Sequence, residues 1–328
     1  MKTVLLMLCA VLLVLTAGCM GEERVTELRV VPAGSLLGPL EEIEAAYEDL
    51  HPGVDVRVEG HGSIQAVRQV TDLHRAVDVV AVADASLIPD MMFRPMEDGS
   101  GNYTDTCTPF ATNEMVIAYT EKSLYADEIT RENWYTILAR PDVRVGFSNP
   151  MLDACGYRAL MVTALAEEHY GNRALFDAII GDHLDPRPAV NRSGGTVAIT
   201  LPEVLRPSDG KVQIRDGSIY LLSLLDAGGI DYAFEYRSVA DAHGLSSINL
   251  PPEIDLSSAA YTDTYRNVTV QLGFQRFGSI GSLRTGAPIV YALTVPATAE
   301  HPEKAASFVA FMLEAFEKGR DGWPQPLG

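Results

Sequence analysis

The apolar positions of the first third of the chain follow two alternating periods. Apolar residues recur every second position over Glu27–Val31 and Val54–Val58, and a continuous apolar run covers Asp78–Val82. After Ser35 and again after Ser63, apolar residues recur at helical spacing. A period of two predicts strands and a period near 3.6 predicts helices. Strands alternating with helices predict an α/β fold with a mainly parallel sheet, whose ligands bind at the carboxyl ends of the strands.

The later pattern predicts a second α/β unit. Met92–Thr112 is rich in Gly, Asn, Thr and Pro, which predicts a loop or a sheet edge, and Met115–Tyr119 predicts a strand that crosses between lobes. Gly181–Gly217 shows neither period, so no element is predicted there. Further strands are predicted over Val143–Phe147, Ile230–Phe234, Leu245–Leu250, Asn267–Leu272 and Pro288–Pro296. Further helices are predicted around Trp134–Leu138, Tyr157–Leu165, Asn172–Ile180, Ser218–Ala227 and Pro302–Phe316.

The length of the chain predicts two lobes. About 300 residues after an export signal exceed the usual size of a single hydrophobic core. We assign residues 27–112 and 292–328 to lobe 1, and residues 113–291, including the hinge strands, to lobe 2. The cleft between two such lobes is the expected ligand site.

The first residues have the pattern of an export signal. Lys2 precedes the apolar run Val4–Leu15, which is too short to span a bilayer. Residues 1–18 are therefore interpreted as a signal peptide, and the small residues before Cys19 resemble a lipoprotein processing site. Residues 19–26 are interpreted as a linker that tethers the protein, through a lipid on Cys19, to the outer face of the cytoplasmic membrane. The alternative is ordinary cleavage near Ala17, which leaves a free Cys19.

Charge and cysteine content narrow the possible functions. The formal net charge of −19 argues against nucleic acid as a partner, because phosphates require a basic surface. It also means that an anionic ligand must be held by local dipoles. Once Cys9 has left with the signal and Cys19 is lipidated, only Cys107 and Cys155 remain, and they match no zinc spacing.

The stretch Ser148–Arg158 combines two opposing features. It leads from a predicted strand into a predicted helix, and a helix N-terminus attracts anions through unpaired N–H groups and a partial positive charge. Asp153, however, places a carboxylate at this junction, and a carboxylate repels an ordinary anion. Two other strand-to-helix junctions carry Gly-Ser pairs, Gly34-Ser35 and Gly62-Ser63, whose N–H groups and hydroxyls suit an oxyanion.

Several segments resemble the archaeal tungstate/molybdate-binding proteins of ABC importers. They are Ala33–Leu36, Asn113–Met115, Gly146–Pro150, Asp153–Arg158 and Asp231–Ala240. The resemblance implies the two-lobed type II periplasmic-binding-protein fold, a monomer without a cofactor or enzymatic activity, and delivery of the ligand to a membrane permease driven by a cytoplasmic ATPase. The chain departs from the family pattern at Ala154, near Ser86 and over Gly181–Gly217.

The resemblance also implies a set of ligand-binding residues. Unlike bacterial molybdate binders, members of this family complete the coordination of the metal with one Asp and one Glu, which correspond here to Asp153 and Glu235. The remaining residues expected to line the site are Gly34, Ser35, Gly62, Ser63, Cys155, Gly156 and Tyr236.

Physical chemistry makes two carboxylates in an oxyanion site intelligible. Sulfate and phosphate have compact centres that accept no further ligands, so a facing carboxylate costs about 1 kcal/mol or more per close contact. Tungsten and molybdenum are larger, and hard oxygen donors suit them, so carboxylates can bond to the metal itself. The two carboxylates then repel sulfate and phosphate while they bond to tungsten or molybdenum, so they make the site selective. The two oxyanions are nearly equal in size and charge, so the sequence favours neither.

Simpler interpretations remain open for each residue. Asp153 is a favoured helix N-cap, Glu235 could pair with Arg237 or another surface cation, and Cys155 suits a small buried filler. Arg158 could pair with Asp153 or be solvated. Alternative functions are a sulfate- or phosphate-binding protein and a secreted hydrolase that uses Asp153 and Glu235 as paired acid and base.

Overall fold

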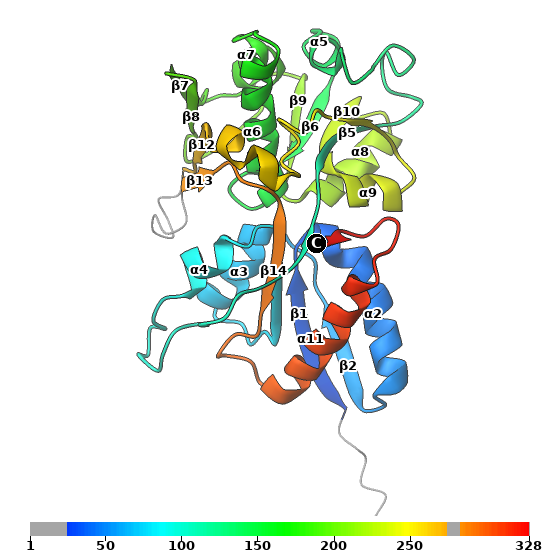
Figure 1. Ribbon diagram of the computed structural model, residues 1–328, viewed down its shortest axis with the longest axis vertical. Helices are drawn as coiled ribbons and strands as arrows, with labels where there is room; N and C mark the ends of the chain where they lie inside the picture. Colours follow the sequence, from blue (N-terminus) through cyan, green and yellow to red (C-terminus); the bar gives the residue numbers. More distant parts are fainter. Residues whose placement is uncertain (1–24, 274–282, 328) are drawn as a thin grey trace, which may run out of the picture.

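The molecule consists of two α/β lobes stacked along its long axis (Figure 1). The computed structural model describes residues 25–273 and 283–327. The predicted signal peptide and Cys19 lie outside these residues. Within the described part of the chain, no helix combines the length and apolar character needed to span a bilayer.

The first lobe contains a six-stranded sheet in the order β15-β4-β14-β3-β1-β2. Its parallel half comprises β1 (Thr26–Pro32), β2 (Val54–Val58) and β3 (Val79–Val82). Antiparallel pairing adds β14 (Val290–Thr294), β4 (Thr108–Thr112) and β15 (Gln325–Pro326). The helices of this lobe are η1 (Gly34–Leu36), α2 (Leu37–Leu50), α3 (Ser63–Thr71), α4 (Leu87–Met92) and α11 (Pro302–Glu317).

The second lobe contains a five-stranded sheet in the order β11-β5-β10-β6-β9. Its strands are β5 (Met115–Tyr119), β6 (Val145–Ser148), β9 (Val212–Arg215), β10 (Tyr232–Tyr236) and β11 (Ser246–Asn249). The longer helices are α5 (Trp134–Leu138), α6 (Ala154–His169), α7 (Leu175–Ile179), α8 (Leu222–Asp226) and α9 (Arg237–Ala242). Short helical segments are η2 (Gly181–His183), η3 (Ser218–Leu221), η4 (Ala259–Tyr261) and α10 (Thr262–Tyr265).

A third sheet of four strands, in the order β13-β12-β8-β7, packs beside α6 (Figure 1). Its strands are β7 (Ala189–Ser193), β8 (Thr196–Thr200), β12 (Val268–Gln271) and β13 (Leu283–Thr285). β7 and β8 lie in the segment for which no element was predicted. They form an antiparallel hairpin in which most side chains are exposed or half-buried, so the apolar alternation of a typical strand is weak.

Four predicted elements differ from the structure. The later strands Asn267–Leu272 and Pro288–Pro296 were expected to carry the chain back to the first lobe together, but the first of them becomes β12 of the third sheet and only β14 joins the sheet of the first lobe. β10 extends to Tyr236, which makes Glu235 a strand residue instead of a loop residue. The predicted helix Asn172–Ile180 starts only at Leu175, and Ser218–Ala227 is divided between η3 and α8.

Helix α6 forms the centre of the second lobe. Of its residues, all from Ala154 to Glu167 are buried, so the helix is enclosed on every side instead of presenting a wet face. It contacts β6, β10 and β12 and packs against α7. A helix enclosed in this way has little freedom to shift, and it therefore fixes the position of its own N-terminus, where Asp153 lies.

Candidate functional site

Asp153 caps helix α6 and at the same time faces the boundary between the lobes. Its side chain is 5% exposed. One carboxylate oxygen accepts a hydrogen bond from the backbone N–H of Cys155 (3.4 Å), as expected of an N-cap. The other accepts a hydrogen bond from the backbone N–H of Ser218 (3.1 Å), which belongs to η3. One oxygen of the Asp153 carboxylate therefore caps the helix, and the other is bonded to Ser218.

Glu235 extends from strand β10 and is completely buried. Its Oε1 accepts hydrogen bonds from the Ser218 hydroxyl (2.9 Å) and from the backbone N–H of Tyr236 (2.8 Å). Its Oε2 has no hydrogen-bond partner within the described part of the chain. Because Ser218 bonds to both carboxylates, the structure brings Asp153 and Glu235 together around one serine.

Burial dominates the electrostatics of this pair. The pKa of Glu235 is raised to about 8, with burial as the largest cause; hydrogen bonds from Tyr236 and Ser218 partly oppose this rise, and the nearby Asp153 carboxylate adds a smaller contribution to it. Burial also raises the pKa of Asp153, and neighbouring hydroxyl and N–H groups oppose this change. Removing two carboxylates from water without a cation is unfavourable, so the pair is a cost to folding.

The first lobe reaches this site through the N-terminus of α3. Gly62 lies directly against the loop before α6, because a Cβ at this position would stand 2.4 Å from Leu152 O and 2.9 Å from Asp153 Cβ. The N–H groups of Ile64 and Gln65 donate to Leu152 O (3.0 and 3.1 Å). The lobes are therefore closed, and a side chain at Gly62 would separate them.

Ser63 is fully buried at the same junction. Its hydroxyl oxygen accepts a hydrogen bond from Ala83 N–H (3.0 Å), which leaves its own hydrogen free to donate. Its backbone N–H lowers the pKa of Asp153, against the larger effect of burial. Of the residues predicted from the first lobe, Ser63 thus lies next to the carboxylate pair.

Gly34 and Ser35 lie at the lobe boundary but are engaged by other groups. The N–H of Gly34 donates to His61 O (2.7 Å), and the Ser35 hydroxyl is hydrogen-bonded to the Tyr291 hydroxyl (2.8 Å). Tyr291 also accepts a hydrogen bond from Asn113 (3.1 Å). In this closed structure these two predicted residues bond to the protein and form no hydrogen bond to the carboxylate pair.

The other three predicted residues surround the pair from the second lobe. Cys155 is buried, and its sulfur lies 3.6 Å from Phe234 O and 4.0 Å from Glu235 Oε1. The N–H of Gly156 donates to Asp153 O (3.2 Å), and its Cα packs so tightly on Ser148 O that a Cβ would lie 2.1 Å away. The backbone N–H of Tyr236 is bonded to Glu235.

Two simpler interpretations of the charged residues are wrong. Arg237 forms an ion pair with Glu114 (2.6 Å) and not with Glu235. Arg158 donates to Ala83 O and to the Tyr236 hydroxyl (both 2.7 Å) and not to Asp153. Both predicted pairings assumed the nearest charge in the sequence, whereas the fold supplies partners from other elements.

Sequence reasoning missed two serines of the site. Ser218 bonds to both carboxylates, and it follows Gly217, so it repeats the Gly-Ser pairs already noted at two other junctions. Ser148 ends β6 and is fully buried beside Asp153, yet its hydroxyl forms no hydrogen bond of normal geometry within the described residues. Glu235 Oε2 is a buried carboxylate oxygen without a partner in the described residues, and such an atom marks a place where a polar ligand belongs.

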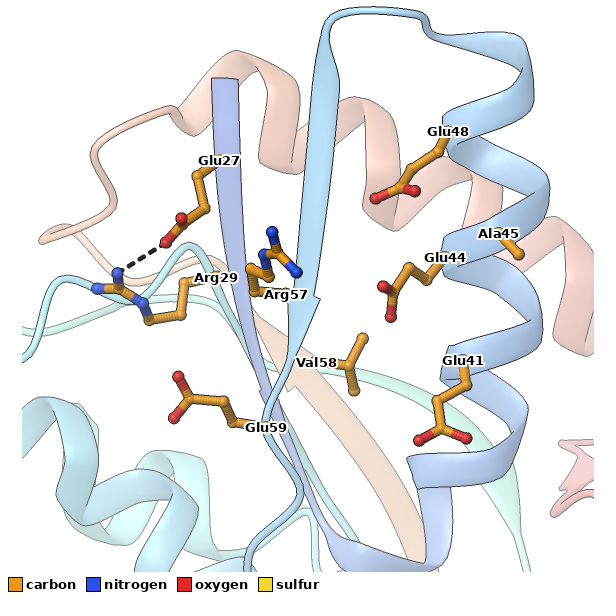
Figure 2. A pocket seen from close by; sticks show the side chains of 9 residues that line it. All are labelled: Glu27, Arg29, Glu41, Glu44, Ala45, Glu48, Arg57, Val58 and Glu59. Carbon is orange, nitrogen blue, oxygen red and sulfur yellow. Dashed lines mark hydrogen bonds and ion pairs between the residues drawn. The ribbon is translucent and has the colours of Figure 1, made fainter. Parts of the chain in front are cut away.

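A large surface hollow lies elsewhere, on the outer face of the first lobe. It has a volume of about 570 Å³ and lies between α2 and the strands β1 and β2 (Figure 2). Glu44 and Glu48 extend from the helix toward the side on which Arg57 lies, Glu41 precedes them on the same helix, and Arg29 pairs with Glu27 (2.9 Å). Five of its nine lining residues are glutamates, so this hollow does not suit an anion. No cluster of three or more His, Cys, Asp or Glu side chains in the described residues could hold a metal ion.

Comparison with known proteins identifies the family. The model of the bacterial extracellular solute-binding proteins matches residues 28–318. The chain belongs to this family. A solute-binding protein is not an enzyme, which excludes the secreted hydrolase. The description of the family as extracellular also agrees with the expected export.

Relatives of this solute-binding protein confirm the resemblance drawn from its motifs. The chain is 41% identical over 330 residues to the molybdate/tungstate-binding protein WtpA of Thermococcus kodakarensis, covering 95% of this chain and 88% of that one. It is 39% identical to WtpA of Pyrococcus abyssi, covering 94% and 87%. An uncharacterized solute-binding protein of Methanoculleus marisnigri is 41% identical, covering 91% and 81%.

Solved structures confirm the two-lobed fold of this solute-binding protein. The periplasmic molybdate-binding protein of Azotobacter vinelandii superposes with a TM-score of 0.54 at 14% identity, covering 90% of this chain and 94% of that one. The sulfate-binding protein SubI of Mycobacterium tuberculosis gives 0.53 at 15%, covering 92% and 87%. Because these two neighbours are named for different anions, the fold alone does not select the ligand.

Proposed function

We propose that this solute-binding protein captures tungstate or molybdate outside the cytoplasm, with Asp153 and Glu235 bonding to the metal of the oxyanion. The observation that carries the proposal is the buried carboxylate pair around Ser218, in which Glu235 Oε2 has no partner in the described residues. The names of the two WtpA relatives, molybdate/tungstate-binding proteins, support the same ligand.

The absence of a counter-ion favours a metal-centred ligand over a compact anion. Neither carboxylate forms an ion pair within the described residues, although burial makes both of them costly to ionise. A resident metal ion would need more ligands than two carboxylates supply. Tungstate and molybdate bring their own oxo ligands, so two protein carboxylates are enough to complete the coordination.

Hydrogen-bond donors around the pair suit the oxo oxygens. The Ser63 hydroxyl has a hydrogen available, the Ser148 hydroxyl lies beside Asp153, and the backbone of α3 begins at the same place. We include Gly62 as a further donor, and also Gly34 and Ser35, which would have to exchange their present bonds to His61 and Tyr291 for bonds to the ligand. Cys155, Gly156 and Tyr236 enclose the pair, and the Cys155 thiol and the backbone N–H groups of Gly156 and Tyr236 are already hydrogen-bonded within the second lobe.

The proposal extends to the route of the ligand. The monomeric protein delivers the oxyanion to an ABC permease and its ATPase, and a lipid on Cys19 tethers it to the outer face of the cytoplasmic membrane. The small residues before Cys19 and the extracellular character of the family support this arrangement. Mass spectrometry of the protein extracted from membranes tests the lipid directly, because an unmodified Cys19 would exclude it.

Calorimetry tests the ligand and the role of the carboxylates together. Wild type is expected to bind tungstate and molybdate but not sulfate, and Asp153→Ala/Glu235→Ala is expected to lose at least about 100-fold in affinity, because each charge-assisted contact contributes about 1.5–3 kcal/mol. The matched control is Glu128→Ala/Asp142→Ala, which removes two exposed carboxylates of the same lobe and should bind normally.

Two results would contradict the proposal. One is sulfate binding as tight as tungstate binding, which would make this a general anion-binding protein like its sulfate-binding structural neighbour. The other is unchanged tungstate affinity in the double variant. Scattering measured in parallel should show that tungstate compacts wild type, since residues of both lobes enclose one site.

A further inference from the structure

A second group of contacts crosses between the lobes, beside the carboxylate site. The hydroxyl of Tyr157, on α6, donates to the carboxylate of Asp84, which follows β3 of the first lobe. Arg158 Nη1 donates to Ala83 O (2.7 Å), and its Nη2 lies 3.8 Å from Asp84. Both α6 side chains are at least 96% buried in this position. These contacts can exist only while the lobes are closed.

A third residue of the second lobe reinforces this arrangement. Arg284, on β13, donates from Nη2 to Asp90 Oδ2 (2.6 Å) and from Nη1 to the Ser86 hydroxyl (3.1 Å). Arg284 is 4% exposed, and both acceptors belong to the α4 region of the first lobe. Ser86 also donates to Asp84, so the two sets of contacts are connected.

We infer that Tyr157, Arg158 and Arg284 form an interlobe latch that retains the bound ligand without contacting it. The three are positioning residues: they hold Asp84, Asp90 and Ala83 O of the first lobe and thereby keep the site shut. This inference rests on the proposed function, because what the latch retains is the oxyanion held by Asp153 and Glu235.

The latch is tied to the carboxylate pair through the elements it shares with them. Tyr157 and Arg158 lie one turn beyond Asp153 on the same buried helix. Arg158 also donates to the hydroxyl of Tyr236, the neighbour of Glu235 on β10 (2.7 Å). A ligand that fixes the positions of the two carboxylates therefore also brings Tyr157 and Arg158 opposite their acceptors in the first lobe.

The electrostatics of Asp84 agree with a latch. Burial raises the pKa of this carboxyl, but Arg158 and the hydrogen bonds from Tyr157 and Ser86 outweigh it, so the net pKa is lowered. Asp84 therefore stays ionised when the lobes close. A cavity of about 600 Å³, lined in part by Asp84, Tyr157 and Arg284, adjoins the contacts. Water in this cavity can solvate the charges when the latch opens.

Stopped-flow kinetics with tungstate test the latch. The variants are Tyr157→Phe, which removes only a hydroxyl, Asp84→Asn, which keeps the turn around Ser86, and the two combined. We expect each to speed tungstate dissociation about 10- to 100-fold, as for the loss of one charge-assisted hydrogen bond, with little change in the association rate. Because both remove the same bond, the combined effect should be smaller than the product of the two.

Two control variants separate the latch from general damage. Tyr170→Phe removes a hydroxyl that bonds within the second lobe, to Trp134, and Arg266→Gln removes a cation of the same cavity that pairs with Asp263 of its own lobe. Both should keep wild-type dissociation rates. Tyr157→Phe and Asp84→Asn should unfold at the wild-type temperature without ligand, because the open lobes do not use the latch.

The inference of a latch is wrong if Tyr157→Phe and Asp84→Asn release tungstate at the wild-type rate, or if the control variants show the same increase in dissociation rate. That failure leaves the proposed function intact, since wild type still binds. If wild type does not bind tungstate, or if Asp153→Ala/Glu235→Ala binds it normally, the proposed function fails and the latch as a determinant of tungstate retention fails with it.

Discussion

Glu235 is placed where a carboxylate is unfavourable for folding. Glu235 is fully buried, its Oε2 has no partner in the described residues, and a second carboxylate shares its serine. An apolar residue or an amide at such a position would make a more stable protein. The conflict between stability and the retained charge is the reason to regard Glu235 as functional, and it can be measured by titration.

Glu235→Gln should change the pH dependence of stability of the ligand-free protein. The pKa of Glu235 is about 8 in the fold and 4.5 ordinarily, so the folded protein binds more protons between these values. The stability that Glu235 contributes is therefore fully present below pH 4.5 and is lost as pH rises toward 8. At pH 8 the variant should be more stable by on the order of 3–5 kcal/mol, and it should not bind tungstate.

Denaturant unfolding at several pH values provides the measurement. The stability difference between variant and wild type should shrink as pH falls toward 4.5. Glu121→Gln, at an exposed position, is the control and should show no such trend. A constant difference across the pH range would mean that Glu235 keeps its ordinary pKa in the ligand-free protein.

At the scale of elements, the sequence was most informative where local pattern determines structure. The strand-to-helix units of the first lobe followed from periodicity, because β1 and α2 each bury one clear set of apolar residues. The hairpin of β7 and β8 was not predicted, because its side chains show little apolar alternation. The hairpin joins the sheet through the pairing of β8 with β12. Such pairing depends on tertiary contacts that no local window contains.

For the candidate site too, residues in recognisable local motifs were predicted, whereas residues placed by tertiary contacts were not. Asp153 and Glu235 were predicted because the motifs around them resemble a known family, and Asp153 also because a carboxylate conflicts with an anion site at a helix N-terminus. Ser218 was missed, although it follows a glycine, because its bonds to both carboxylates depend on how η3 is placed between α6 and β10. The partners of Arg158 were missed because Ala83 and Asp84 reach it only across the closed cleft.

Gly62→Ala is expected to separate closure from folding. The added Cβ would meet Leu152 O at 2.4 Å, and this backbone atom of the opposite lobe cannot yield as a flexible side chain could. The clash arises only between closed lobes, so the free protein should fold normally while tungstate affinity falls by at least about 10-fold, or 1.4 kcal/mol.

Calorimetry and thermal unfolding check this expectation. Gly38→Ala is a matched control, since a Cβ at that position in α2 meets nothing within 4 Å. It should bind tungstate normally and be slightly more stable, because alanine favours helix. Normal binding by Gly62→Ala would show that the lobes close less tightly around the ligand than in this structure.

At the scale of the whole molecule, the charge opposes the proposed ligand. The net charge of −19 includes an acidic hollow on the first lobe, and it repels a dianion at long range (Figure 2). Attraction arises only within the cleft, from N–H groups and hydroxyls around the carboxylates. Long-range repulsion acts on the approach of the ligand, while short-range contacts act on its retention, so salt should affect the two steps differently.

Raising NaCl from about 20 to 200 mM should speed tungstate association several-fold, because the Debye length falls from about 20 Å to under 10 Å. Dissociation should hardly change, since the closed lobes enclose the site and exclude the salt. Stopped-flow mixing measures both rates, and sucrose solutions of matched viscosity control for diffusion. A slower association at high salt would show instead that the cleft presents a positive field strong enough to outweigh the charge of the whole protein.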